Sequence, residues 1–183
     1  MAQEIIKPQL VTEAEYILSE TKSEQKNEFL SGKLISMKGA SFEHNEISLT
    51  IAILLKQLLK GTKWKIAMEA VKTKNSEGNF FYPDLMVCNP NPDKYFSSEP
   101  ILLIEIISGE SRKYDLIDKF IQYQKIETLK HYVCVEPEQQ VVLFYNKADD
   151  GTWTIETFSK DEDILQLTKL NISFNLKQIY KPE

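Results

Sequence analysis

The chain has 183 residues, which is enough for one domain with a hydrophobic core and too few for two comfortable ones. Its hydrophobic share of 42% and charged share of 27% are ordinary for a globular protein and exclude a disordered or fibrous chain. The net charge of -5 argues against a protein that coats nucleic acid, because such binding comes from Lys and Arg side chains that neutralise phosphates. It leaves open an enzyme that contacts nucleic acid through one local patch and a bound cation. We expect a single domain over residues 1–183.

Hydrophobic runs and cysteines predict the surroundings of the protein. The longest apolar run, residues 100–107, is far shorter than the roughly 20 residues that a membrane span requires, so we expect no membrane partner. The N-terminal segment has no basic stretch followed by a hydrophobic one, so it does not resemble a secretory signal. The two cysteines, Cys88 and Cys134, both lie in apolar segments. We expect them to be buried free thiols in a cytoplasmic protein.

The first third of the chain predicts two helices and a hairpin. Residues 10–21 have the pattern of a short amphipathic helix with a capping-box pair at its start. Residues 29–37 are typical of a hairpin with Gly32 and Lys33 at the turn. A stronger helix is expected over about residues 43–60. Its apolar face consists of Ile47, Ile51, Leu54, Leu55, Leu58 and Leu59.

Strands predominate after residue 63. Residues 64–72 alternate in the manner of a strand, residues 80–88 predict a second one, and residues 89–100 contain three prolines that indicate a loop. Residues 101–107 have the pattern of a central strand buried on both faces, and a helix is expected over 114–125. Further strands are predicted at 131–136, 141–146 and 153–158. This order of elements favours an α/β fold with a mixed sheet.

Glu105 is the most informative residue of the chain. It is the only charged residue in the apolar segment ILLIEIIS. An ionised carboxylate without a partner there would cost several kcal/mol, so Glu105 must be paired, neutralised or bound to a metal. The alternatives to a functional site are a buried ion pair and a strand end that reaches solvent.

Asp84 is the matching acid of a second apolar strand, FFYPDLMVC. Pro83 directly before it indicates an edge position or a break in the ladder of hydrogen bonds. The ordinary interpretation is that Asp84 caps or turns the start of the strand. If this strand and that of Glu105 are neighbours, both carboxylates can point into one pocket. A hard divalent cation is the usual remedy for their repulsion.

Lys119, on the helix that follows the strand of Glu105, is the candidate cation of this site. Its ordinary interpretation is an exposed ion pair with Asp115, four residues earlier, worth only ~0.3–0.5 kcal/mol. Beside two buried carboxylates, however, the helix is well placed to hold an ammonium over a metal site. Lys119 lies clear of an expected apolar stripe of Leu116, Ile117, Phe120 and Ile121.

The order of these features, a PD pair, an apolar strand with one Glu and a helix with Lys, resembles the PD-(D/E)XK nuclease superfamily. More narrowly, the chain resembles the Uma-type putative restriction endonuclease family, a widespread bacterial group. The matching segments are YPDLMV (82–87), LLIEIISGESRKYDLIDKFIQY (102–123), HYVCVEP (131–137) and NEFLSGKLISMKGASFEHNEI (27–47). Together they cover most of the chain from about residue 10 to 147. The resemblance implies a restriction-endonuclease-like mixed β-sheet flanked by helices.

The resemblance also implies a catalytic site. Asp84 and Glu105 correspond to metal ligands for Mg²⁺ or Mn²⁺, and Lys119 to the catalytic cation. One departure from the superfamily is that Ile107 stands where a lysine is expected, two residues after the Glu. In this family the basic residue has moved to the following helix, where Lys119 matches it.

Two further residues, Glu28 and His44, match recurrent polar positions of the family. Glu28 is expected to complete the metal site from the hairpin, while His44 has either a catalytic role or an ordinary one at a helix N-terminus. The implied activity is hydrolysis of nucleic acid, with DNA as the expected substrate, by a metal-activated water. Lys119 would orient that water or stabilise the charge that builds on the phosphate.

Two other classes of function stay open at this stage. A catalytically idle nuclease-fold module, acting in nucleic-acid binding or protein assembly, is favoured by the acidic pI near 5.2. The costly carboxylates in apolar strands argue against it. The other class is a structural protein that forms a homodimer through a sheet edge, for which the segment Val141–Tyr145 is the candidate.

Overall fold

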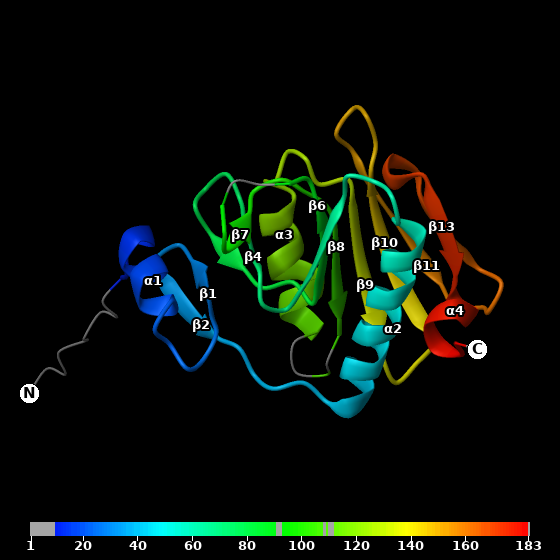
Figure 1. Ribbon diagram of the computed structural model, residues 1–183, viewed down its shortest axis with the longest axis horizontal. Coiled ribbons are helices and arrows are strands. Elements are labelled where there is room, and N and C mark those ends of the chain that lie inside the picture. The colour runs from blue at the N-terminus through cyan, green and yellow to red at the C-terminus, as the bar shows by residue number, and fades with distance from the viewer. Residues whose placement is uncertain (1–9, 91–92, 108, 110–111, 183) are drawn as a thin grey trace, which may run out of the picture.

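The computed structural model describes residues 10–90, 93–107, 109 and 112–182 (Figure 1). The helices are α1 (Glu13–Glu20), α2 (Phe42–Leu58), the π-helix η1 (Tyr114–Lys119), α3 (Phe120–Tyr123), the 3₁₀-helix η2 (Thr168–Leu170) and α4 (Leu176–Tyr180). The strands are β1 (Asn27–Leu30), β2 (Lys33–Ser36), β3 (Lys65–Met68), β4 (Lys72–Lys74), β5 (Phe80–Phe81), β6 (Leu85–Cys88), β7 (Phe96–Ser97), β8 (Pro100–Ile106), β9 (His131–Glu136), β10 (Val141–Lys147), β11 (Trp153–Phe158), β12 (Ile164–Leu167) and β13 (Ile172–Asn175).

A six-stranded sheet with the order β11-β10-β9-β8-β6-β3 lies at the centre of the fold. Its neighbouring strands are antiparallel except for β8 and β9, which are parallel. Parallel neighbours require a crossover connection, usually helical, and η1 and α3 lie in this one. The mixed α/β sheet expected from the sequence is therefore confirmed.

The two faces of this sheet are covered by different parts of the chain. In Figure 1, α2 runs across one face, with β13 and α4 beside it toward the C-terminus. Ile51 and Leu55 of α2 pack there against Leu102 and Ile104 of β8 in the larger hydrophobic core. On the opposite face, the crossover packs on Leu103 and its neighbours. Because side chains alternate along a strand, Glu105 belongs to the same face as Leu103.

A smaller five-stranded sheet, in the order β2-β1-β5-β4-β7, adjoins the crossover side. Helix α1 and the hairpin β1–β2 lie together at the N-terminal end of the molecule (Figure 1). They are held by a cluster of aromatic rings, in which the centroids of Tyr16 and Phe29 lie 5.1 Å apart and those of Tyr16 and Phe80 lie 5.3 Å apart. This sheet carries Glu28 on β1 toward the central sheet.

Several local predictions are confirmed by these elements. Thr12 caps α1 and forms the expected capping box with Glu15. The predicted apolar face of α2 lies in the larger core, and the strands β9 and β11 have the predicted bounds. Cys88 and Cys134 are buried free thiols. No helix in the described part of the chain is long and apolar enough to cross a membrane.

The hairpin turn differs by one residue from the prediction. It is formed by Ser31 and Gly32, with φ angles of 50° and 83°, and Lys33 already belongs to β2. Two consecutive residues with positive φ are the mark of a type I′ turn, whose twist matches that of the flanking strands. Ser31 N–H donates to the side-chain oxygen of Asn79 at 2.8 Å, which fixes the turn on the neighbouring segment.

Both strands predicted between residues 64 and 88 are interrupted. The predicted strand 64–72 divides into β3 and β4 at Glu69, and the predicted strand 80–88 divides into β5 and β6 at Pro83. In each case the first and second parts pair in different sheets. Proline cannot donate to a ladder, so the second break has a direct cause in the sequence. The loop predicted at 89–100 contains the short strand β7.

The prediction that the segment Val141–Tyr145 forms a free sheet edge is wrong. Residues Val141–Tyr145 belong to β10, which pairs with β9 on one side and with β11 on the other. Its backbone groups are therefore already used within the sheet, and the outer strands of the central sheet are β11 and β3. A homodimer stays a prediction, without that strand as its interface.

Candidate active site

The segment that crosses from β8 to β9 differs in kind from the predicted helix over 114–125. Its residues Tyr114–Lys119 form the six-residue π-helix η1, and the α-helix α3 follows directly. Ile117 and Ile121, which the sequence places on the buried stripe, are each 50% exposed, whereas Asp115 and Lys119 are buried. Single π-turns within helices are frequent at functional sites. Here the π-turn directs an acid and a cation toward the sheet.

The ammonium of Lys119 is surrounded by three carboxylates. Its Nζ lies 3.0 Å from Glu105 Oε1, 3.1 Å from Glu28 Oε1 and 3.4 Å from Asp115 Oδ1. The four side chains are at most 6% exposed. The expected pair with Asp115 exists, but the expectation that it is exposed is wrong. We call these four residues the Lys119 cluster.

Two tyrosines and a backbone amide orient the acids of the cluster. The Tyr123 hydroxyl donates to Glu105 Oε1 at 2.7 Å, and the Tyr114 hydroxyl donates to Glu28 Oε2 at 2.7 Å. The backbone N–H of Tyr82 donates to Glu28 Oε1 at 2.9 Å. Glu28 thus connects the smaller sheet, the crossover and the start of β6. These contacts fix the carboxylates on several rigid elements at once.

The charges of the Lys119 cluster do not balance. Burial raises the pKa of Glu105 well above its ordinary value, and the carboxylates of Asp84, Asp115 and Glu28 act in the same direction, while Lys119 opposes them. Burial acts to lower the pKa of Lys119, but Glu105 and Glu28 outweigh it and raise that pKa well above its usual range. One ammonium among several acids leaves an excess of buried negative charge, which a proton or a further cation must neutralise.

Asp84 lies beside Glu105 on the neighbouring strand. In the antiparallel register of β6 and β8, Leu85 pairs with Ile104, so the next position outward on each strand is Asp84 and Glu105 respectively. Asp84 Oδ2 accepts a hydrogen bond from the Ile106 N–H at 2.7 Å. The carboxylate therefore connects the two strands where their backbone pairing ends. It lies at the start of β6 and adds its charge to that of the Lys119 cluster.

His44 reaches the same carboxylate from another element. Ser41 caps α2 by accepting a hydrogen bond from the His44 N–H at 3.2 Å. The imidazole Nε2 of His44 then lies 3.1 Å from Asp84 Oδ2. The side chains of His44 and Asp84 are 11% and 12% exposed. His44 therefore has more than the ordinary position at a helix N-terminus.

Glu69 is a neighbouring acid that sequence reasoning missed. Ligand atoms of His44, Glu69 and Asp84 all lie within 4.8 Å of one another, which is a spacing suited to a metal ion. Glu69 has a φ of 38°, and its backbone N–H donates to the Asp84 backbone oxygen at 3.1 Å. Its backbone carbonyl accepts from Lys26 Nζ at 3.1 Å. The sequence offers one sign of it: Glu69 is an acidic residue within the alternating segment 64–72. The structure shows that the predicted strand breaks at this residue.

The five predicted site residues fall into two connected groups. Glu28, Glu105 and Lys119 meet in the Lys119 cluster, while Asp84 and His44 meet at the end of the sheet. Of the alternatives for Glu105, a solvent-reaching strand end is wrong, and the buried ion pair is present. The oxygen and imidazole donors fit a divalent cation, and the buried Nδ1 of His44 has no hydrogen-bond partner among the described residues.

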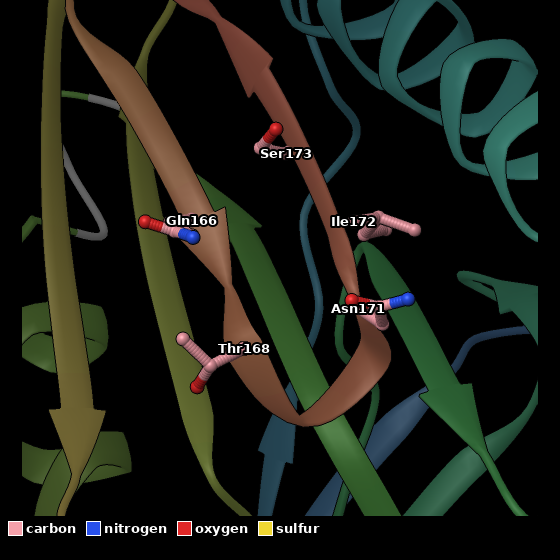
Figure 2. Close-up of a pocket in the computed structure, with 5 residues that line it drawn as sticks. All are labelled: Gln166, Thr168, Asn171, Ile172 and Ser173. Atoms are coloured by element: carbon pink, nitrogen blue, oxygen red, sulfur yellow. The ribbon is translucent and has the colours of Figure 1, made fainter.

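A shallow pocket of about 120 Å³ lies elsewhere, on the hairpin of β12 and β13 (Figure 2). It is lined by Gln166, Thr168, Asn171, Ile172 and Ser173. In Figure 2, Gln166 and Thr168 lie on one arm of the hairpin, and Asn171, Ile172 and Ser173 lie on the other. None of the lining residues carries an ionisable side chain or belongs to the charged groups described above. This pocket offers hydrogen bonds but no acid, base or nucleophile of the kind that hydrolysis needs.

The fold is a restriction-endonuclease-like α/β fold: it has a mixed β-sheet, helices on its faces, and the acids Asp84 and Glu105 at one end of the sheet. A crystal structure of a putative nuclease belonging to DUF820, from Anabaena variabilis, has the same fold with a TM-score of 0.77. It is 16% identical to this chain, and the alignment covers 93% of this chain and 97% of that one. Residues 13–177 match the family Uma2, described as "Putative restriction endonuclease", and the chain belongs to this family.

Two relatives from Synechocystis sp. are similar over most of their length. The uncharacterized protein slr1290 is 31% identical over 172 residues, which cover 91% of this chain and 90% of the relative. The uncharacterized protein sll1609 is 28% identical over 152 residues, which cover 80% of this chain and 86% of the relative. Their names add no activity to the family assignment.

Proposed function

We propose that the protein is a divalent-metal-dependent endonuclease that hydrolyses phosphodiester bonds of nucleic acid, with DNA as its substrate. The observation that carries the proposal is the buried excess of carboxylates around Lys119, directly beside Asp84. Such an arrangement is stable only with additional positive charge, and a divalent cation is what phosphodiester hydrolysis requires. The family description and the name of the structural neighbour from Anabaena variabilis refer to the same class of enzyme.

Asp84 and Glu105 are the proposed ligands of Mg²⁺ or Mn²⁺. A bound cation of this kind lowers the pKa of a water molecule and polarises a phosphoryl oxygen. Lys119, held by Glu105 and Glu28, presents its ammonium to the phosphate and stabilises the charge that develops there. Glu28 serves as a positioning residue, because it contacts Lys119 and Tyr114 rather than the reacting atoms. A water oxygen bonds to phosphorus, the bond to the leaving oxygen breaks, and that oxygen takes up a proton.

A nicking assay on supercoiled plasmid tests this function. The wild type is incubated with Mg²⁺, with Mn²⁺ and with EDTA, beside Asp84→Asn and Glu105→Gln, and labelled RNA is assayed in parallel. We expect nicking with either metal, none with EDTA, and none from either variant, because each loses a charged ligand. Glu156→Gln, an exposed acid on the outer strand β11, is the matched control and should cut like the wild type. Metal-independent nicking, or activity that survives in both carboxylate variants, would refute the proposal.

A catalytically idle module is the second candidate, favoured by the net charge of -5. Such a protein binds nucleic acid weakly, since few cations are available to neutralise phosphates. It would bind the plasmid or a partner without nicking it under any metal condition. If the wild type cleaves the plasmid with a divalent metal and does not cleave it with EDTA, this candidate is excluded.

A further inference from the structure

Three potential ligands meet at the end of the central sheet from three separate segments. His44 comes from the first turn of α2, Asp84 from the start of β6, and Glu69 from the break after β3. Mg²⁺ and first-row metal ions hold nitrogen and oxygen ligands at about 2.1 Å, so ligands on opposite sides of one ion are about 4.2 Å apart. The three ligand atoms lie within 4.8 Å of one another. A small rotation of the side chains therefore suffices to bring them onto one cation.

Two buried polar atoms without partners lie behind this group on α2. Among the described residues, neither His44 Nδ1 nor Ser48 Oγ makes a hydrogen bond, although Ser48 is fully buried and His44 is only 9% exposed. His44 and Ser48 are one helical turn apart and therefore lie on the same face of α2. Buried polar atoms normally have hydrogen-bond partners, so two buried atoms without partners on one face of a helix require an explanation.

Coordination of a metal ion by the His44 imidazole would explain these two unpartnered atoms. A histidine that ligates a metal through Nε2 carries its proton on Nδ1 and usually donates it to a neighbouring oxygen, which fixes the orientation of the ring. In the metal-free protein Nε2 lies 3.1 Å from Asp84 Oδ2, and Nδ1 has no hydrogen-bond partner among the described residues. A cation on Nε2 leaves the proton on Nδ1, and the side-chain rotation that brings Nε2 onto the cation would let Nδ1–H donate to the Ser48 hydroxyl. Both atoms then gain a partner.

We propose that His44 and Glu69 are further ligands of the cation held by Asp84, that Ser48 orients His44, and that this mixed nitrogen and oxygen site prefers Mn²⁺ to Mg²⁺. The inference rests on the proposed metal dependence and assigns to it two ligands and a metal preference. Mg²⁺ is held almost entirely by oxygen ligands, whereas imidazole favours transition ions. In the metal affinity series Mn²⁺ is the weakest of the first-row ions, so Zn²⁺ and Co²⁺ are expected to bind more tightly still.

Direct titration of the full chain with Mn²⁺ tests the assignment without relying on activity. Free Mn²⁺ is measured by its electron paramagnetic resonance signal, and Mg²⁺ is then added as a competitor. We expect Glu69→Gln and His44→Asn to weaken Mn²⁺ binding at least tenfold, and Glu156→Gln to leave it unchanged. In the wild type, more than a tenfold excess of Mg²⁺ should be needed to displace half of the Mn²⁺; in His44→Asn less should suffice. Glu69→Gly serves as a second variant, because it removes the carboxylate and suits the positive φ of this position.

Ser48→Ala separates the orienting role from a structural one. Because the Ser48 hydroxyl has no partner in the described structure, its removal should leave the melting temperature of the metal-free protein unchanged or higher. Loss of the acceptor for His44 should still weaken Mn²⁺ binding about tenfold. A lower melting temperature with unchanged Mn²⁺ affinity would assign Ser48 a structural role only.

The outcomes distinguish this inference from the proposed function. If Glu69→Gln binds Mn²⁺ as tightly as the wild type while the wild type nicks plasmid, the inference fails and the nuclease stands. If Mn²⁺ binding depends on Glu69 and His44 but no metal supports nicking, the metal site stands and the nuclease fails. A wild type that binds neither Mn²⁺ nor Mg²⁺ overturns both.

Discussion

The two faces of the central sheet bury ionisable residues in opposite ways. On the face covered by α2, His131 is fully buried, stacks on Phe144 with ring centroids 5.5 Å apart, and has no hydrogen-bond partner for either nitrogen among the described residues. On the crossover face, Glu105 has both Lys119 and Tyr123 within hydrogen-bond distance. A neutral imidazole can be tolerated in an apolar core, whereas a carboxylate must be matched by donors and cations. We therefore expect catalysis on the charged face, and we expect the apolar face to contribute mainly to the free energy of unfolding.

The largest effect should follow from removal of the cation on the charged face. Lys119→Met leaves the carboxylates of Glu28, Glu105 and Asp115 buried without their common partner. Breaking a buried ion network from one side costs about 3–5 kcal/mol of unfolding free energy. Urea denaturation at pH 7 measures the loss. A cost below about 1 kcal/mol would mean that the cluster is protonated or hydrated and that the ammonium does not hold it together.

A matched truncation on the apolar face sharpens this comparison. Leu55 of α2 is fully buried in the larger core, and Leu55→Ala should also cost about 3 kcal/mol, because it leaves a cavity. The two variants should differ in how they respond to acid. Protonation of the carboxylates restores part of the stability of Lys119→Met at low pH, whereas it does nothing for Leu55→Ala. Parallel pH profiles for the two variants would remove the distinction between the faces.

His131 should make the apolar face sensitive to acid. Burial lowers the pKa of His131 to about 4 from its ordinary 6.5, and the charges of Lys169 and Lys130 add to the shift. Between these two pH values the unfolded chain binds a proton that the folded chain does not bind, so the unfolding free energy falls as the pH falls from 6.5 to 4. A shift of this size corresponds to about 3 kcal/mol.

His131→Phe tests that dependence, since phenylalanine keeps the stacking on Phe144 and cannot be protonated. We expect the difference in unfolding free energy between pH 7 and pH 4 to be about 3 kcal/mol smaller in the variant than in the wild type. Urea denaturation at several pH values provides the measurement. Equal pH dependence in the two proteins would show that His131 is not the acid-sensitive group.

The smallest effect concerns one hydroxyl of the charged face. Tyr123→Phe removes the donor to Glu105 and keeps the ring in the core, so it should cost about 1.5–3 kcal/mol, as hydrogen bonds to charged groups do. Tyr145→Phe is the matched control on the same face, because the Tyr145 hydroxyl has no hydrogen bond among the described residues. Equal destabilisation by the two changes would assign the effect to packing instead.

Much of this architecture could be predicted from the sequence, because periodicity and single charges in apolar strands are local signals. Asp84 and Glu105 are recognisable in that way, and the antiparallel pairing of β6 with β8 places them opposite each other. The π-turn of η1 could not be predicted, since the pattern of Leu116, Ile117 and Phe120 is equally compatible with an α-helix. The π-turn leaves Ile117 exposed and directs Lys119 inward, where its ammonium contacts three carboxylates.

Glu69 escaped prediction for a different reason. Its side chain reaches Asp84 only because the chain leaves β3 through a residue with positive φ, and glutamate gives no local sign of that conformation. Pro83 marks the other break, and proline makes that break recognisable from the sequence. The sequence thus reveals sites carried on regular strands more readily than those that depend on irregular turns.

The central claim is that one divalent cation binds at Asp84, beside Glu105, at the end of the sheet. Crystals of the full chain soaked in Mn²⁺ and measured at a wavelength with strong manganese anomalous scattering test it most directly. We expect one dominant anomalous peak within coordination distance of the Asp84 carboxylate. A dominant peak at another site, or none near Asp84 at a saturating Mn²⁺ concentration, would contradict the account.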